Sequence, residues 1–236
     1  MNKILDPSPI YDVCATPAYL GGQTTNYQMN AIKTSALALL AIGSALLTNA
    51  QTVPSAAPVG VLGHRYTEIN FGAQDIKGIN RNVYGLGIEG NTPVSSNLDV
   101  GLGYTYNWIG GAFKGHANTL GATATAYTAM NGVKPFVGVG LGYRWEDFGG
   151  FDNNYGLWGA AVGVEIPVGA FSFTPAISYG DDFESTANSS QQFNYGVDVN
   201  YWFSTASAVT AGASFTNEYR GNGESWNYTV GYRWKF

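Results

Sequence analysis

Apolar and polar residues alternate strictly along most of the chain. Between residues 98 and 108, large apolar and aromatic side chains occupy every second position, and Asp, Gly, Thr and Asn stand between them. Successive side chains of a β-strand point to opposite faces, so this stretch has one apolar and one polar face. Helical periodicity is absent from His64 onward. The pattern therefore predicts strands that separate an apolar medium from a polar one.

The same alternation predicts ten strands. They are 65–74, 80–91, 97–108, 116–129, 133–147, 154–167, 170–181, 191–203, 206–219 and 224–236. Each reaches the roughly 9–11 residues that a strand needs to cross a bilayer, whereas strands of soluble proteins usually have about five or six. Eight strands remain an alternative, because the first and fourth segments alternate least clearly.

The composition agrees with a membrane barrel. Charged residues make up only 11% of the chain, against about a quarter in an average soluble domain. Glycine occurs 32 times, aromatic residues make up 14%, and no run of about 20 apolar residues could form a transmembrane helix. A barrel needs apolar residues only at alternate positions, and it must close because lipid offers no partners to open strand edges. We therefore predict an all-β fold, a closed antiparallel up-and-down transmembrane barrel.

The connections between the predicted strands alternate between short and long. Short turns are expected near Thr92-Pro93, Asn131-Gly132, Val168-Gly169 and Thr205. Longer connections, rich in Gly, Asp, Asn and Ser, are expected at 109–115, 148–153 and 182–190. Even-stranded outer-membrane barrels have short periplasmic turns and longer outer loops. The short turns therefore predict which end of the barrel faces the periplasm.

The amino-terminal quarter of the chain predicts an export signal. Residues 29–50 carry a positive Lys33, an apolar stretch and a final Thr48-Asn49-Ala50, which is the order found in a cleaved signal peptide with a helical core. Residues 1–28 are expected to be a non-native or unstructured leader. Residues 51–63 are expected to be a flexible periplasmic lead-in to a barrel formed by 64–236.

Charged side chains fall on the predicted inner face of the strands, where they avoid lipid. The expected lumen network contains Glu68, Glu89, Asp99, Lys134, Arg144, Glu165, Asp198, Arg233 and Lys235. The network has two interpretations, a set of salt bridges that plugs the barrel or a charged constriction that selects small solutes. Barrels of eight strands are filled by side chains and open porins have about sixteen strands. Ten strands therefore favour the plug, although many inward glycines leave space.

Aromatic residues gather at both ends of the outward faces, as the two membrane interfaces require. The expected girdle contains Trp108, Tyr143, Trp145, Trp158, Tyr179 and Trp226 on the outer side and Tyr201 and Phe203 on the periplasmic side. Tyr155 is also assigned to the outer girdle. This sorting of residue types by depth supports a membrane-spanning barrel.

The last strand ends with Tyr232, Trp234 and Phe236 at alternate positions. This ending resembles the carboxy-terminal signature of Gram-negative outer-membrane barrels, and the resemblance implies that the barrel-assembly machinery reads these residues during insertion. The region 64–236 resembles the small OmpA-, OmpX- and opacity-type barrels and porin-like barrels, although it has ten apparent strands rather than eight. The resemblance implies an outer-membrane location, with membrane lipid and lipopolysaccharide as partners.

The sequence argues against several other functions. A net charge of -5 excludes a basic nucleic-acid surface, and no cofactor or metal site is expected. Gly85 to Gly90 match a dinucleotide-binding spacing, but they lie inside a strand with no helix after it. Asp181, Asp182 and His116 are the candidates for a rim site like that of outer-membrane proteases of the omptin type.

Three functional hypotheses follow. The first is a non-enzymatic envelope or surface-interaction protein with a lumen plugged by salt bridges. The alternatives are a narrow porin for small polar solutes and a hydrolase at the outer rim. The sequence leaves the oligomeric state open.

Overall fold

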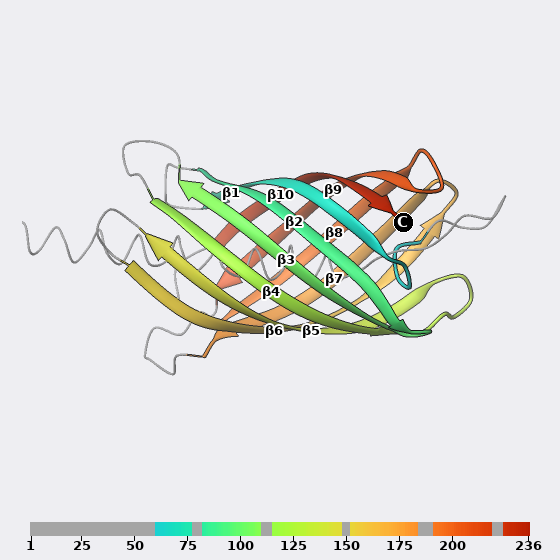
Figure 1. Cartoon of the computed structure of the whole chain (residues 1–236), viewed down its shortest axis with the longest axis horizontal. Coiled ribbons are helices and arrows are strands. Elements are labelled where there is room, and N and C mark those ends of the chain that lie inside the picture. Colours follow the sequence, from blue (N-terminus) through green and yellow to red (C-terminus); the bar gives the residue numbers. More distant parts are fainter. Residues whose placement is uncertain (1–59, 77–81, 110–114, 148–151, 184–190, 219–223) are drawn as a thin grey trace, which may run out of the picture.

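The protein is a closed barrel of ten antiparallel strands (Figure 1). The computed structural model describes residues 60–76, 82–109, 115–147, 152–183, 191–218 and 224–236. The strands are β1 (Tyr66–Ile76), β2 (Asn82–Ser95), β3 (Leu98–Ile109), β4 (Gly115–Tyr127), β5 (Lys134–Asp147), β6 (Asp152–Val168), β7 (Phe171–Asp182), β8 (Gln192–Trp202), β9 (Ser207–Glu218) and β10 (Glu224–Lys235). The predicted fold class is confirmed, and the eight-strand alternative is wrong.

The two ends of the strand order pair with each other. β1 runs antiparallel to β10 from the pair Tyr66 and Lys235 to the pair Ile76 and Ser225, without a register shift. Every other strand pairs with its neighbours in chain order. No strand edge is left open in the described barrel, so each strand has a hydrogen-bonded neighbour on both sides.

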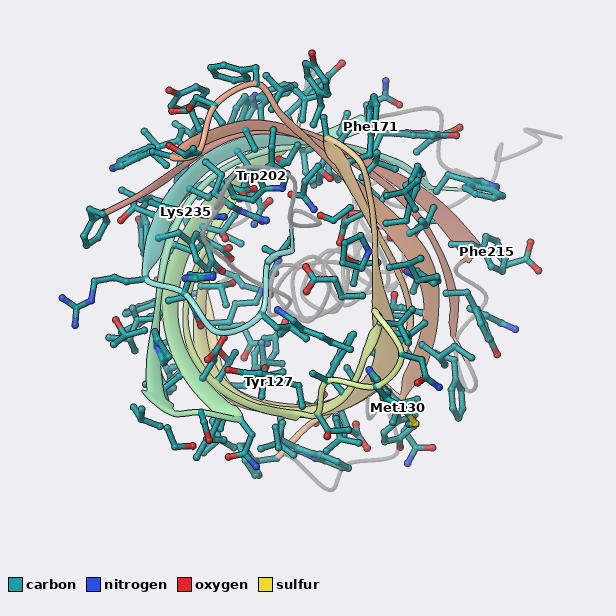
Figure 2. The ribbon with its side chains drawn as sticks, turned by 90° about the vertical axis from the view of Figure 1, so that its right-hand side faces the viewer. Tyr127, Met130, Phe171, Trp202, Phe215 and Lys235 are labelled. Atoms are coloured by element: carbon teal, nitrogen blue, oxygen red, sulfur yellow. The ribbon has the colours of Figure 1, made fainter. Side chains whose placement is uncertain are left out.

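The alternation places apolar side chains outside and polar side chains inside. On β5, Val137, Val139 and Leu141 are exposed, while Arg144 and Glu146 are buried in the lumen. Figure 2 looks along the barrel and shows Phe171 and Phe215 outside the ring of strands. An apolar exterior of this extent is suited to lipid and would associate or aggregate in water.

The turn between β4 and β5 follows the sequence prediction. Asn131 and Gly132 have φ values of 51° and 82°. The amide of Met130 donates to the carbonyl of Val133 at 2.9 Å, and the amide of Val133 donates back at 3.0 Å. Two successive residues with positive φ match the twist of antiparallel strands, which explains the Asn-Gly pair. The short connections after Val168 and around Thr205 also lie where the sequence places them.

The first short turn lies later than predicted. β2 continues through Thr92 and Pro93 to Ser95, and the chain turns at 96–97. A register shift between Pro93 and Ser95 marks a bulge. A proline lacks an amide donor but is tolerated at a bulge, so Pro93 does not end the strand.

The predicted outer loops lie largely outside the described residues, as do 1–59 with the predicted leader and signal peptide. Of the predicted lead-in 51–63, only 60–63 are described, and they are not solvated periplasmic chain. Val61 and Leu62 are fully buried inside the barrel. Within the described ranges, no helix is long and apolar enough to cross a membrane.

A charge on the outward face should destabilise the barrel far more than a charge at a turn. Leu141→Arg places a cation at the middle of β5, where we expect a loss of about 2–4 kcal/mol in the free energy of unfolding. The measurement is urea unfolding in lipid vesicles, followed by tryptophan fluorescence. Met130→Arg, in the exposed β4–β5 turn, is the matched control. Equal losses in the two variants would contradict the assignment of the β5 outer face to lipid.

Candidate functional site: the barrel lumen

The nine predicted charged residues reach the lumen in three clusters. The mouth cluster, at the end with the short turns, contains Asp99, Lys134, Glu165 and Lys235. The Arg233 cluster contains Glu68, Glu89, Asp198 and Arg233. The outer cluster contains Arg144 with Glu146 and Tyr155. The end with the short turns faces the periplasm in barrels of this type.

The mouth cluster is built around a piece of the chain itself. Residues 60–64, here called the mouth segment, lie inside the barrel before β1 begins. The amides of Val61 and Leu62 donate to the two carboxylate oxygens of Glu165, the second at 3.1 Å. Lys134 Nζ lies 3.6 Å from Glu165 Oε2 and donates to the Leu62 carbonyl at 2.7 Å. One ion pair therefore holds three backbone groups of the mouth segment.

Asp99 holds the next residues of the mouth segment. The Gly63 amide donates to Asp99 Oδ2 at 2.9 Å. Asn91 Nδ2 donates to the same oxygen at 3.1 Å and to the His64 carbonyl at 3.0 Å. Tyr127 completes the group by donating its hydroxyl to Asp99 Oδ1 at 3.3 Å. These contacts join β2, β3 and β4 to the mouth segment.

Two apolar subsites in the barrel wall hold the side chains of Val61 and Leu62. Val61 packs with Trp202 and Ala208, and Leu62 packs with Tyr127 and Phe136. Figure 2 shows Trp202 and Tyr127 pointing into the ring from different parts of the wall. Burial of two aliphatic side chains is worth roughly 1.5–3 kcal/mol each, which adds to the polar contacts.

Lys235 joins the mouth segment to the last strand. Its Nζ lies 3.5 Å from the ring centroid of Trp202 and 3.5 Å from the Gly60 carbonyl oxygen. Lys134 lies on β5 and Glu165 on β6, while Lys235 lies on β10. The mouth segment therefore contacts opposite parts of the barrel wall.

The Arg233 cluster joins the strands on both sides of the closure. Arg233 forms an ion pair with Glu68, its register partner on β1. Its Nη1 donates to Asn200 Oδ1 at 2.7 Å, and its guanidinium lies 4.8 Å from the centroid of the Tyr66 ring. The Tyr66 hydroxyl donates to Glu89 Oε1 at 2.8 Å. A guanidinium suits this position because its planar group serves several acceptors and one ring at once.

Asp198 is the third carboxylate of the Arg233 cluster and interacts electrostatically with Glu68 and Arg233. Gly212, its register partner on β9, makes room for it, because a Cβ there would overlap Asp198 Oδ1. Three carboxylates thus surround one guanidinium. The cluster occupies part of the lumen, and its excess of carboxylates attracts a cation more strongly than an anion.

The outer cluster is smaller. Arg144 and Glu146 lie on the same face of β5 and form an ion pair. The Tyr155 hydroxyl donates to the Glu146 carboxylate at 2.7 Å. The assignment of Tyr155 to the outer girdle is wrong, because its side chain is buried in the lumen beside Leu157. Residue parity explains this position, since Tyr155 is the register partner of the inward Arg144.

A small cavity remains beside these clusters, with a volume of about 80 Å³. Inward positions that carry no side chain or a small polar one make up much of its wall, including Gly87, Gly103, Gly121, Gly140, Thr105 and Thr119. Glycine wall positions keep this part of the lumen from being filled by side chains. The cavity can hold a few water molecules, but it is far smaller than the lumen of an open porin.

The structure places the predicted girdle residues on the outer face of the barrel. Exposed ring pairs include Tyr143 with Trp145 at 5.4 Å and Phe171 with Tyr201 at 5.0 Å between centroids. The remaining predicted girdle residues are Trp108, Trp158, Tyr179, Phe203 and Trp226, and each lies against another aromatic ring. Tyr232 and Trp234 lie on the same outer face near the end of β10, where Tyr232 lies against Trp234, and the exposed Phe236 follows the strand.

The structure does not assemble the candidate rim site. His116, on β4, lies against the ring of Tyr106 at 5.8 Å between centroids. Asp181 and Asp182 end β7, and β5 and β6 separate that strand from β4. In the part of the chain that the structure describes, no three His, Cys, Asp or Glu side chains come together as a metal site.

Sequence reasoning missed the uncharged members of the lumen network. Tyr66, Asn91, Tyr127 and Asn200 each bind a predicted charged residue. Their inward parity could have identified them. Val61 and Leu62 could not be found in this way, because they precede the first alternating strand.

Comparisons with known proteins agree on the fold. No family model and no curated protein sequence matches the chain. Among solved structures, the translocator domain of the autotransporter NalP from Neisseria meningitidis has a TM-score of 0.51 at 10% identity, and the match covers 89% of this chain and 98% of that one. Neisserial surface protein A has a TM-score of 0.42 at 15% identity, covering 73% of this chain and 97% of that one. An outer-membrane channel from Pseudomonas putida F1 has a TM-score of 0.48 at 9% identity, covering 79% and 100%. The chain has the fold of bacterial outer-membrane β-barrels, which agrees with the predicted outer-membrane location.

The ion pair between Glu68 and Arg233 gives a test of the lumen network. Glu68→Leu leaves the Arg233 guanidinium buried without its main partner, and we expect a loss of about 3–5 kcal/mol in the free energy of unfolding. Arg233→Met removes the other partner, and because it also leaves Glu89 and Asp198 without the guanidinium, the double variant Glu68→Leu with Arg233→Met should lose clearly less than the sum of the two single variants. Urea unfolding in vesicles measures all three variants. A double variant that loses the sum of the two single effects would show that the groups are not paired.

His64 gives a second test, because it belongs to the mouth segment. Burial, followed by the nearby charges of Lys235 and Lys134, lowers the pKa of His64 from 6.5 to about 3. The neutral ring is therefore the form that fits the mouth, and its contribution to stability is lost as the pH falls from about 6.5 toward 3. NMR titration of a His116→Gln protein, in which His64 is the remaining histidine, should give a midpoint far below 6.5. A midpoint near 6.5 would place His64 in open solvent.

Proposed function

We propose that this protein is a non-enzymatic outer-membrane barrel, closed to solutes, that acts in envelope structure or in surface interaction. The observation that carries the proposal is the mouth segment, which crosses the lumen at the end with the short turns and is held by buried and part-buried contacts on opposite parts of the wall. A transport path for polar solutes would have to pass through it.

The pairing of the lumen charges supports the same proposal. Glu165 binds Lys134 and two amides, Asp99 binds an amide and two side chains, and Arg233 binds Glu68. Charged groups that already bind one another contribute to rigidity and offer little to a passing solute. Ion-selective constrictions, in contrast, present charges that the solute itself must meet.

Membrane lipid and lipopolysaccharide are the proposed partners of the outer face. The exposed aromatic residues and the aliphatic band between them support this, since such girdles lie at the two interfaces of a bilayer. We propose as well that Tyr232, Trp234 and Phe236 serve as the assembly signal. Tyr232 and Phe236 are exposed and Trp234 is half-buried, which supports it, because a signal must be accessible to the machinery that reads it.

A narrow pore for small polar solutes is the second candidate. The cavity of about 80 Å³ and the glycine positions in its wall favour it. A displaced mouth segment would leave this part of the lumen less filled than in a barrel packed throughout with large side chains.

Single-channel conductance distinguishes these two candidates. The protein is purified from outer membranes in detergent and added to a planar bilayer, and its insertion is checked by the gel mobility of boiled and unboiled samples. The closed barrel predicts a silent bilayer at moderate voltages, because the mouth segment lies across the lumen. Reproducible small steps from the unmodified protein would contradict the closed lumen and support the pore.

A further inference from the structure

The contacts of the mouth segment resemble those of a bound peptide more than those of a strand. Its amides bind the carboxylates of Glu165 and Asp99, and its carbonyls accept from Lys134, Lys235 and Asn91. All these partners are side chains of the wall. A strand would instead bind the backbone of a neighbouring strand.

The barrel wall contacts both the backbone and the side chains of the mouth segment. Successive amides at Val61 and Leu62 share one carboxylate, which is a charge-assisted contact that any residue type can make. The two apolar subsites add selectivity for aliphatic side chains. The site therefore fits a short peptide that carries two adjacent aliphatic residues and turns directly after them.

Gly63 forms the turn that connects this site to the start of β1. Its φ is 99°, a backbone conformation that residues other than glycine rarely adopt. The Gly63 amide also binds Asp99. A β-branched residue at this position would strain the turn and displace the residues before it.

The barrel does not depend on the segment for its closure. The register between β1 and β10 begins at Tyr66, after the segment has ended. When the segment leaves, Glu165 keeps Lys134 as its ion-pair partner, and Asp99 keeps Asn91 and Tyr127. An empty site would therefore be a polar, hydrated opening in an intact barrel.

We propose that the periplasmic mouth is a peptide-binding site, that residues 60–64 occupy it, and that their release opens the lumen. The proposal rests on the proposed closed barrel and adds the group that closes it. The ligand class is a short peptide with two adjacent aliphatic side chains followed by a glycine turn. The chain's own Gly60-Val61-Leu62-Gly63 is the resident ligand.

The first test removes the apolar contact of the segment. Leu62→Asp places a carboxylate in the apolar subsite formed by Tyr127 and Phe136, which disfavours binding of the segment. The full-length variant should therefore give conductance steps where the unmodified protein gives none. Gly63→Val should open the lumen by a different route, through backbone strain. Asp147→Asn, at the exposed outer end of β5, is the control and should stay silent.

The second test restores the ligand from outside. A synthetic peptide with the sequence of residues 60–65, added on the periplasmic side, should close the Leu62→Asp channel in a concentration-dependent way. The same peptide with Asp at the leucine position should leave the channel open. Failure of the first peptide to reduce the conductance at millimolar concentration would overturn the peptide-binding site.

The third test locks the segment in place. Val61 packs against Ala208, so cysteines at these two positions, in a Cys14→Ser background with Gly63→Val, should form a disulfide that holds the segment. The oxidised protein should be silent, and reduction should restore the steps. Identical conductance before and after reduction, with the disulfide verified, would contradict the proposed closure.

The outcomes separate this proposal from the one on which it rests. Steps from the unmodified protein would contradict the closed barrel itself. The release of the segment is checked by a Val61→Cys substitution in the Cys14→Ser background, whose thiol should react with an impermeant maleimide at least tenfold faster when Leu62→Asp is also present than when Leu62 is retained. If the Leu62→Asp variant shows this faster reaction and is still silent, the mouth segment is not the group that closes the lumen. The closed barrel would then stand, with its closing group elsewhere in the lumen.

Discussion

Backbone hydrogen bonding in lipid is the constraint on which the rest of the structure depends. A strand inside a bilayer has no water to bind its amides and carbonyls, so every edge must pair with another edge. The pairing of β1 with β10 meets this need and joins ten amphipathic strands into one closed surface. Closure also creates an inner face, and the second half of the alternating pattern is therefore available for polar side chains.

The inner face then has to satisfy its own charges. Three ion pairs of the described residues lie in the lumen, and they join Glu68 with Arg233, Glu146 with Arg144, and Glu165 with Lys134. Buried pairs of this kind contribute little net stability, but loss of one partner is costly. They fix the spacing of the wall, and at the periplasmic mouth they also bind the backbone of the chain before β1. The interior thus combines a structural network with a site that a peptide can fill.

The fold could be predicted from the sequence because lipid imposes a two-residue period on every strand. That period predicts Val139 outside and Arg144 inside, and it also predicts that the aromatic residues near the strand ends face outward. Two errors came from local interpretation. Pro93 was expected at a turn but lies at a bulge within β2, and Tyr155 was expected outside although its parity matches the lumen. The mouth segment has no such period, so its position depends on contacts with Glu165 and Asp99 that only the three-dimensional arrangement reveals.

Amide hydrogen exchange of the protein in lipid nanodiscs tests the central claim most directly. The account predicts that the amides of Val61, Leu62 and Gly63 exchange slowly, near the rates of strand amides, because buried carboxylates accept from all three. Exchange at the rate of an unstructured chain would contradict it, because the segment would then lie outside the lumen.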